Sequence, residues 1–112
     1  MQLELTREGG HLTAALIGEL DHHAAAEVRQ TIDTALLSCR PQTLRLDLSR
    51  LTFMDSSGIG LVMGRFRTVQ PLGGKLIVSN LSPQVYKIMK LAGLEKIVTL
   101  SKREDVNNAE IK

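Results

Sequence analysis

Aromatic residues are scarce in this chain of 112 residues: Phe53, Phe66 and Tyr86 are the only three, and tryptophan is absent. The core must therefore be built from aliphatic side chains. A domain of this length buries roughly two-thirds of the surface that its unfolded chain exposes, so it needs no disulfide or metal to fold. Proteins that bind single-stranded nucleic acid stack the bases on aromatic rings, and the shortage of rings argues against that class.

Cysteine pairs, basic runs and long apolar runs are also missing. Cys39 is the only cysteine, so no internal disulfide can form, which suits a reducing cytoplasm. The net charge is +2, and no run of Lys or Arg offers a phosphate-binding stripe to nucleic acid. No apolar run approaches the roughly 18 residues of a membrane span, and the N-terminal residues lack a signal-peptide pattern. We expect a single cytoplasmic domain over residues 1–112, with an ordered core over about 1–101, a polar tail over 102–112, and neither nucleic acid nor a membrane as partner.

Hydrophobic periodicity predicts strands and helices in alternation. Apolar and polar residues alternate on both sides of Gly9-Gly10, which is the pattern of an antiparallel hairpin. Asp21 and Ser82 are good N-caps in front of stretches with helical spacing. Strands are predicted over residues 2–7, 11–17, 43–49, 75–79 and 96–101, and helices over 22–37, 57–70 and 83–92; the polar tail is compatible with a short, marginal helix.

This order of elements is typical of an α/β protein. Strands that alternate with helices are joined by parallel crossovers, and the first two strands add an antiparallel pair. We predict a mixed β-sheet with an N-terminal β-hairpin and helices packed on the sheet. Leu51 and Phe53 follow the third predicted strand and are expected to anchor the chain in the core.

The segment "LTFMDSSGIG", residues 51–60, places two serines where a helix begins. One serine is enough to cap a helix, and two interpretations stay open. In the first, Ser56 and Ser57 serve only the cap. In the second, one caps while the other projects into solvent, where a kinase reaches it. A phosphate there would be stabilised by the helix N-terminus, and it would add a charge of about −1.5 to −2 beside Asp55.

The helix that follows these serines has an unusual outer side. Its apolar residues form one stripe that faces the core: Ile59, Val62, Met63, Phe66 and Val69. The opposite side carries Ser57, Gly60, Leu61, Gly64 and Thr68. A glycine inside a helix costs about 1 kcal/mol relative to alanine, so two glycines beside an outward-facing leucine favour a partner surface over internal packing. Arg65 and Arg67 are expected to be solvated on the flank of the helix.

Three carboxylates are predicted to gather near the two serines. Glu19 and Asp21 follow the second predicted strand, and Asp55 lies just after the third. If these two strands run parallel, their carboxyl ends lie at one edge of the sheet. The three side chains would then form an acidic rim around Ser56, which suits a basic partner surface.

Catalytic, cofactor and metal sites are not predicted. A serine nucleophile needs an oriented base, and nothing in the sequence places His11, His22 or His23 near Ser56. The glycines at 58, 60 and 64 miss the dinucleotide fingerprint by one residue. The adjacent histidines 22 and 23 diverge on a helix and make a poor metal pair.

Three segments resemble one known family. They are "GELDHH" at 18–23, "LDLSRLTFMDSSGIG" at 46–60 and "GGKLIVSNLSPQVYKIMKLAGLEKIV" at 73–98. Together they resemble the anti-sigma factor antagonists, which are single STAS domains, over about residues 1–101, and the first segment resembles the sporulation sigma-F branch. The resemblance implies a STAS-type α/β fold and a regulatory protein that is not an enzyme.

The resemblance also implies a partner switch. In this family the anti-sigma factor is a serine kinase that uses ATP, and it phosphorylates the first serine after the aspartate, which is Ser56 here. The unphosphorylated protein binds the kinase and frees the sigma factor, the phosphorylated protein does not bind, and a serine phosphatase restores it. Ser57 is then the cap or its neighbour. We expect the kinase to dock on Glu19, Asp21, Asp55, Ser57, Gly58, Gly60 and Leu61.

Two other functions are open alternatives. The glycines at a helix start also suit a STAS domain that binds a small ligand or a nucleotide. A third interpretation is a scaffold subunit of a stress-signalling assembly, although the short chain carries no segment beyond the domain to support it.

Overall fold

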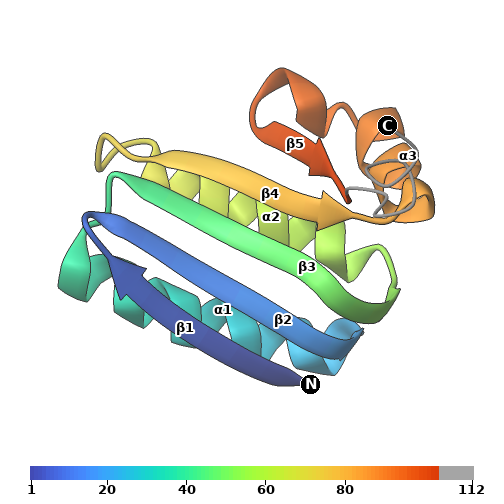
Figure 1. Cartoon of the computed structure of the whole chain (residues 1–112), viewed down its shortest axis with the longest axis horizontal. Coiled ribbons are helices and arrows are strands. Elements are labelled where there is room, and N and C mark those ends of the chain that lie inside the picture. The colour runs from blue at the N-terminus through green and yellow to red at the C-terminus, as the bar shows by residue number, and fades with distance from the viewer. Residues whose placement is uncertain (104–112) are drawn as a thin grey trace, which may run out of the picture.

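The computed structural model describes residues 1–103, which form a five-stranded mixed sheet with helices packed on it (Figure 1). The strands lie in the order β1-β2-β3-β4-β5; β1 and β2 pair antiparallel, and all other neighbours pair parallel. The predicted α/β class, N-terminal hairpin and parallel crossovers are confirmed. The predicted tail helix lies outside the described residues. The elements are β1 Gln2–Glu8, β2 His11–Leu20, α1 His22–Cys39, β3 Thr43–Met54, α2 Ser57–Val69, β4 Lys75–Leu81, α3 Pro83–Leu91, the 3₁₀ turn η1 Leu94–Lys96 and β5 Thr99–Lys102.

The core lies between one face of the sheet and the two long helices. Figure 1 shows α1 behind β1 and β2, and α2 behind β3 and β4. Residues 44, 46 and 48 of β3 are buried, as period-2 alternation requires, and α1 buries one residue per turn. The buried hydrophobic residues are all Leu, Ile, Val, Ala or Met, so the expectation of an aliphatic core is confirmed.

Strands β2 and β3 both run further than the sequence predicted. The pairing continues past residue 17 to Glu19 beside Phe53 and Leu20 beside Met54, with register shifts on the way. These bulges change the phase of the alternation, so that the polar pair Ser49-Arg50 fits inside a strand rather than ending it. The expectation that Phe53 is anchored in the core is wrong, because Phe53 is 50% exposed; Leu51 is half-buried against the core.

A polar network joins the middle of β3 to the end of β4 and to the residue after β5. The Asp47 carboxylate accepts hydrogen bonds from the Ser49 N–H at 3.0 Å and from the Asn80 side chain at 2.9 Å. Burial alone would raise the pKa of Asp47, but these hydrogen bonds outweigh it and the pKa lies below its ordinary value. Arg103, just after β5, donates to the Ser49 carbonyl at 3.0 Å. The network thus links β3, β4 and the residue that follows β5.

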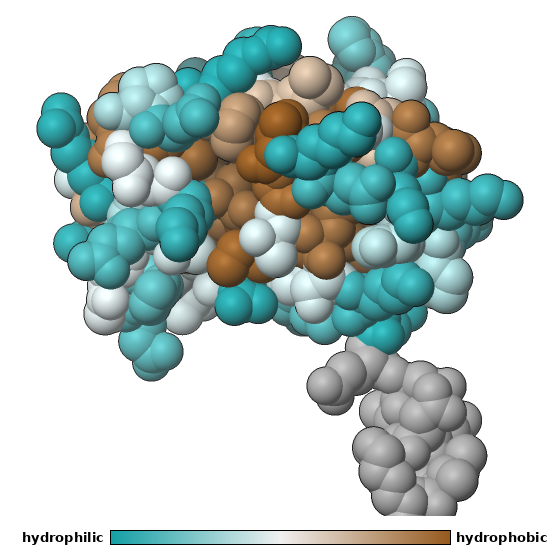
Figure 2. Space-filling view, turned by 90° about the horizontal axis from the view of Figure 1, so that it is seen from above, coloured by the Kyte–Doolittle hydropathy of each residue, from teal (hydrophilic) through white to brown (hydrophobic). Residues whose placement is uncertain are grey.

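The last strand is shorter than predicted, because residues 94–96 form the turn η1 and the Val98 N–H donates to the Leu94 carbonyl at 3.0 Å. A groove of about 460 Å³ separates this segment from α2, and its apolar lining includes Phe66, Leu76 and Ile97. Figure 2, seen from above the view of Figure 1, shows apolar surface bordered by polar side chains. None of the helices in residues 1–103 is both long and apolar enough to cross a membrane.

Candidate functional site

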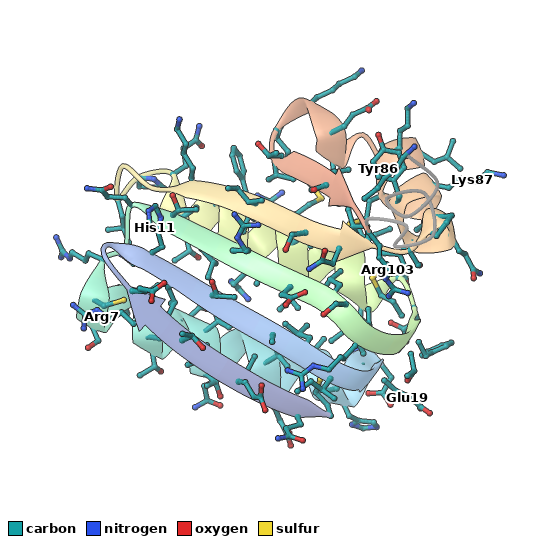
Figure 3. All side chains as sticks on the ribbon, viewed as in Figure 1. Arg7, His11, Glu19, Tyr86, Lys87 and Arg103 are labelled. Atoms are coloured by element: carbon teal, nitrogen blue, oxygen red, sulfur yellow. The ribbon has the colours of Figure 1, made fainter. Side chains whose placement is uncertain are left out.

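The candidate site lies where β2 and β3 end side by side. Because these strands are parallel, Glu19, Asp21 and Asp55 lie at one edge of the sheet, and the Asp55 N–H donates to the Leu20 carbonyl at 3.3 Å. Figure 3 shows Glu19 at this edge, far from Arg7 and His11 at the hairpin turn. The structure therefore brings the three predicted carboxylates to one edge.

The start of α2 is capped by Asp55 and by neither serine. The Asp55 carboxylate accepts from the Ser57 N–H at 2.8 Å, the bond of an Asx turn. Ser56 stands at the N-cap position with a helical backbone, and its side chain makes no capping hydrogen bond. The prediction that Ser57 or its neighbour is the capping serine is wrong, because the aspartate performs that task. Ser56 is exposed, and its hydroxyl makes no hydrogen bond within residues 1–103.

Gly58 is buried rather than exposed to a partner. A Cβ at this position would overlap the Met54 side chain and would lie 3.3 Å from the Leu20 Cδ2 atom. The last residues of β2 and β3 thus pack directly against the first turn of α2. The expectation of Gly58 as a surface residue is wrong, since its lack of a side chain serves this close internal approach.

Leu61 also proves to be buried, with 5% of its surface exposed, so the expectation that it faces outward is wrong. The sequence analysis assumed that this helix has one buried face, but α2 packs against α1 as well as against the sheet. Arg65, expected in solvent, lies in the same helix interface at 4% exposure, and its Nε atom is 2.9 Å from the Asp33 carboxylate. Burial lowers the pKa of Arg65, and Asp33 only partly offsets this. Arg67 is exposed, as expected.

A shallow groove of about 330 Å³ follows the line between α1 and α2. Gly60 lies at its rim, and a Cβ there would meet no atom within 4 Å. The sequence analysis assigned no surface role to the helix over 22–37, so it missed this wall of the groove. The groove is lined by His22, Ala25, Ala26, Arg29, Ser57, Gly60 and Leu61.

The charges at the site are mixed. Asp21 caps α1 by accepting from the Ala24 N–H at 2.9 Å, and this bond holds the pKa of Asp21 below its ordinary value. His22 and His23 follow it on α1, and Arg29 lines the same groove as Ser57. The groove beside Ser57 therefore carries the permanent positive charge of Arg29, in addition to the carboxylates at the strand ends. Within residues 1–103, no cluster of three His, Cys, Asp or Glu side chains is arranged to hold a metal ion.

Comparison with known proteins identifies the family. The STAS domain model matches residues 2–107, so the chain belongs to the STAS-domain family. The anti-sigma F factor antagonist of Paenibacillus polymyxa is 36% identical over 104 residues, which cover 93% of this chain and 89% of that protein. The anti-sigma F factor antagonist of Lysinibacillus sphaericus is 43% identical over 94 residues, which cover 83% of this chain and 79% of that protein. Within the STAS domains, these relatives place the chain among the anti-sigma factor antagonists.

One solved relative has been captured in two chemical states. The unphosphorylated anti-sigma factor antagonist SpoIIAA matches with a TM-score of 0.74 and 32% identity, covering 96% of this chain and 94% of that one. The phosphorylated form of SpoIIAA from Bacillus matches with a TM-score of 0.73 and 33% identity, covering 99% and 100%. This chain is thus about equally similar to both states of that protein.

Proposed function

We propose that this anti-sigma factor antagonist acts in the cytoplasm as a phosphorylation-controlled binding module. Its unphosphorylated form binds an anti-sigma factor that is an ATP-dependent serine kinase, and the sigma factor is released. Phosphorylation of Ser56 ends this binding, and a serine phosphatase restores it. The observation that carries the proposal is the free, exposed hydroxyl of Ser56, left without a capping role because Asp55 supplies the cap.

The geometry explains how a phosphate would act on binding rather than on folding. Backbone N–H groups at the start of α2 and the positive end of its dipole offset the new charge, so the helix stays formed. A partner that docks over the start of α2 meets a charge of about −1.5 to −2 next to Asp55. Binding then also requires desolvation of the phosphate. The near-equal similarity of this chain to both forms of SpoIIAA supports a switch without a change of fold.

We propose that a separate kinase supplies the phosphoryl group. Nucleophilic catalysis by Ser56 would need a base within hydrogen-bond reach. Within residues 1–103 the one side-chain hydrogen bond at the serine pair runs from the Ser57 N–H to the Asp55 carboxylate, and it involves neither hydroxyl. The direct test is incubation with the cognate kinase and ATP, followed by mapping of the modified peptide by mass spectrometry. Modification at Ser56 supports the proposal, and modification elsewhere with Ser56 intact refutes the site.

Gly60 and Gly64 offer a matched pair for locating the docking surface. At both positions a Cβ would have no atom within 4 Å, so Gln fits the fold at both, and it raises helix propensity. We expect Gly60→Gln to weaken kinase binding by about tenfold, roughly 1.4 kcal/mol, because it fills the rim of the α1–α2 groove. Gly64→Gln, about 6 Å further along the helix, should bind more nearly as the wild type does. Titration calorimetry with both variants measures this, and full affinity of Gly60→Gln would remove that rim from the interface.

The proposed kinase-docking surface includes further residues near Ser56. We propose that Glu19, Asp21, Asp55 and Ser57, at the same end of β2 and β3 as Ser56, belong to it, whereas Gly58 and Leu61 are buried and contribute through internal packing. A second function, binding of a nucleotide, is favoured by the groove of about 330 Å³ with Arg29 in its wall. A calorimetric titration of the isolated protein with purine nucleotides separates the two. Tight binding would favour the second function over the first.

A further inference from the structure

Phe53 is placed where an aromatic ring contributes little to the fold. It is one of only three aromatic residues in the chain, yet half of its surface is exposed. The next residue, Met54, shows which way the Phe53 side chain points. Met54 packs toward the buried Gly58, and successive side chains of a strand point to opposite faces. Phe53 is therefore turned away from α2 and toward the other side of the sheet.

A small groove separates the end of β3 from the start of α3. Its volume is about 150 Å³, and a protein cavity of about that size holds a benzene ring. The α3 wall is fixed, because Ser82 caps the helix by accepting from the Val85 N–H at 3.2 Å and Pro83 occupies the first turn. The groove, which we name the Phe53 groove, is lined by Leu51, Thr52, Phe53, Met54, Ser82, Gln84, Val85 and Ile88.

The Phe53 groove is continuous with the proposed docking surface. Phe53 lies three residues before Ser56, and in the sheet it pairs with Glu19 of β2. The exposed ring thus borders a groove with both apolar and polar lining; Glu19 lies beside it in the neighbouring strand, and Asp55 follows two residues later in the chain. A second copy of this chain is a poor occupant, because a symmetric contact would bring these carboxylates against their own copies. A partner with an apolar side chain flanked by Lys or Arg fits both the groove and the carboxylates beside it.

We propose that the Phe53 groove receives an apolar side chain of the anti-sigma kinase when the kinase presents its active site to Ser56. This proposal rests on the proposed function and adds an anchor to it. The carboxylates at 19 and 55 orient the kinase, and burial of one apolar side chain beside the exposed ring supplies affinity that does not depend on Ser56. The same contact serves the kinase twice: it positions Ser56 for phosphorylation, and it stabilises the complex in which the unphosphorylated protein holds the kinase.

Truncation of the ring tests the groove. We expect Phe53→Ala to weaken binding of the unphosphorylated protein to the kinase by roughly 30-fold, as removal of an aromatic anchor does. Phe53→Leu should keep most of the affinity, because the groove stays apolar. The matched control is Leu91→Ala, which removes a side chain that is 79% exposed on α3 and should bind as the wild type does. Circular dichroism and thermal unfolding check that each variant is folded.

The possible results distinguish a wrong groove assignment from a wrong proposed function. If the wild type binds the kinase and Phe53→Ala binds equally well, the groove assignment is wrong and the proposed function stands. If the wild type does not bind, both fall. A photo-crosslinking phenylalanine analogue at position 53, which keeps the ring, gives a second measurement. Crosslinking to the kinase supports the groove, whereas crosslinking only to a second copy of the chain overturns it.

Discussion

Ser56→Asp should lower the affinity for the anti-sigma kinase by about 30-fold or more, while Ser56→Ala keeps the affinity of the wild type. An unpaired carboxylate brought into an interface costs about 2–5 kcal/mol, much of it because the charge loses water without gaining a partner. Asp55, next in the chain, already supplies one carboxylate at the start of α2. Asp carries less charge than phosphoserine, so this value is a lower bound for the natural switch. Titration calorimetry with the anti-sigma kinase measures the difference.

The same substitutions carry an internal control for folding. Loss of a capping serine usually costs about 1 kcal/mol, but Ser56 makes no capping bond, so Ser56→Ala should change the free energy of unfolding by less than about 0.5 kcal/mol. Asp55→Ala should cost the full amount of about 1 kcal/mol, because it removes the acceptor of the Ser57 N–H. Equal kinase affinities of Ser56→Asp and Ser56→Ala would contradict the switch, and a destabilised Ser56→Ala would contradict the capping assignment.

The serine pair also shows what a sequence can and cannot predict. The position of the helix start was readable from Asp, Ser and Gly after an apolar run, and so was the redundancy of two serines. The capping atom was not, because an aspartate one residue earlier reaches the same N–H group through an Asx turn. Only the three-dimensional structure distinguishes these two ways of satisfying one donor.

The second limit concerns helices with two packed sides. Periodicity in α2 reports the face toward the sheet, but α1 also lies along the helix and buries Leu61 and Arg65. Which helices become neighbours depends on the strand order, and residues far apart in sequence decide it. The position at which β3 ends also depends on a distant segment. Its pairing with β2 includes register shifts, and these let the strand continue through Ser49 to Met54. The parallel order itself was predictable, because alternating strands and helices leave few other connections.

Replacement of Asp33 should lower the free energy of unfolding far more than replacement of Arg65, its partner in the ion pair between α1 and α2. The Arg65 side chain is 5% exposed, whereas the Asp33 side chain is 34% exposed, and their charged atoms are 2.9 Å apart. Asp33→Ala leaves the guanidinium buried without its counter-charge and near Arg29, which already opposes it. Removal of one partner of a buried pair costs about 3–5 kcal/mol, and the partial exposure of Asp33 places this case near the lower end, about 3 kcal/mol. That loss is a large part of the stability of a small domain.

Arg65→Met should cost far less, because Asp33 can turn its carboxylate to water while a methionine fills the space between the helices. Replacement of a buried charge by an apolar side chain of similar volume is often neutral or stabilising. Arg67→Met, on the exposed side of the same helix, is the matched control and should change the free energy of unfolding by less than about 0.5 kcal/mol. Urea unfolding of the three variants measures the differences. If Asp33→Ala were no less stable than Arg65→Met, the pair would not secure the α1–α2 interface, and the groove beside Ser57 and Gly60 would owe its shape to apolar packing alone.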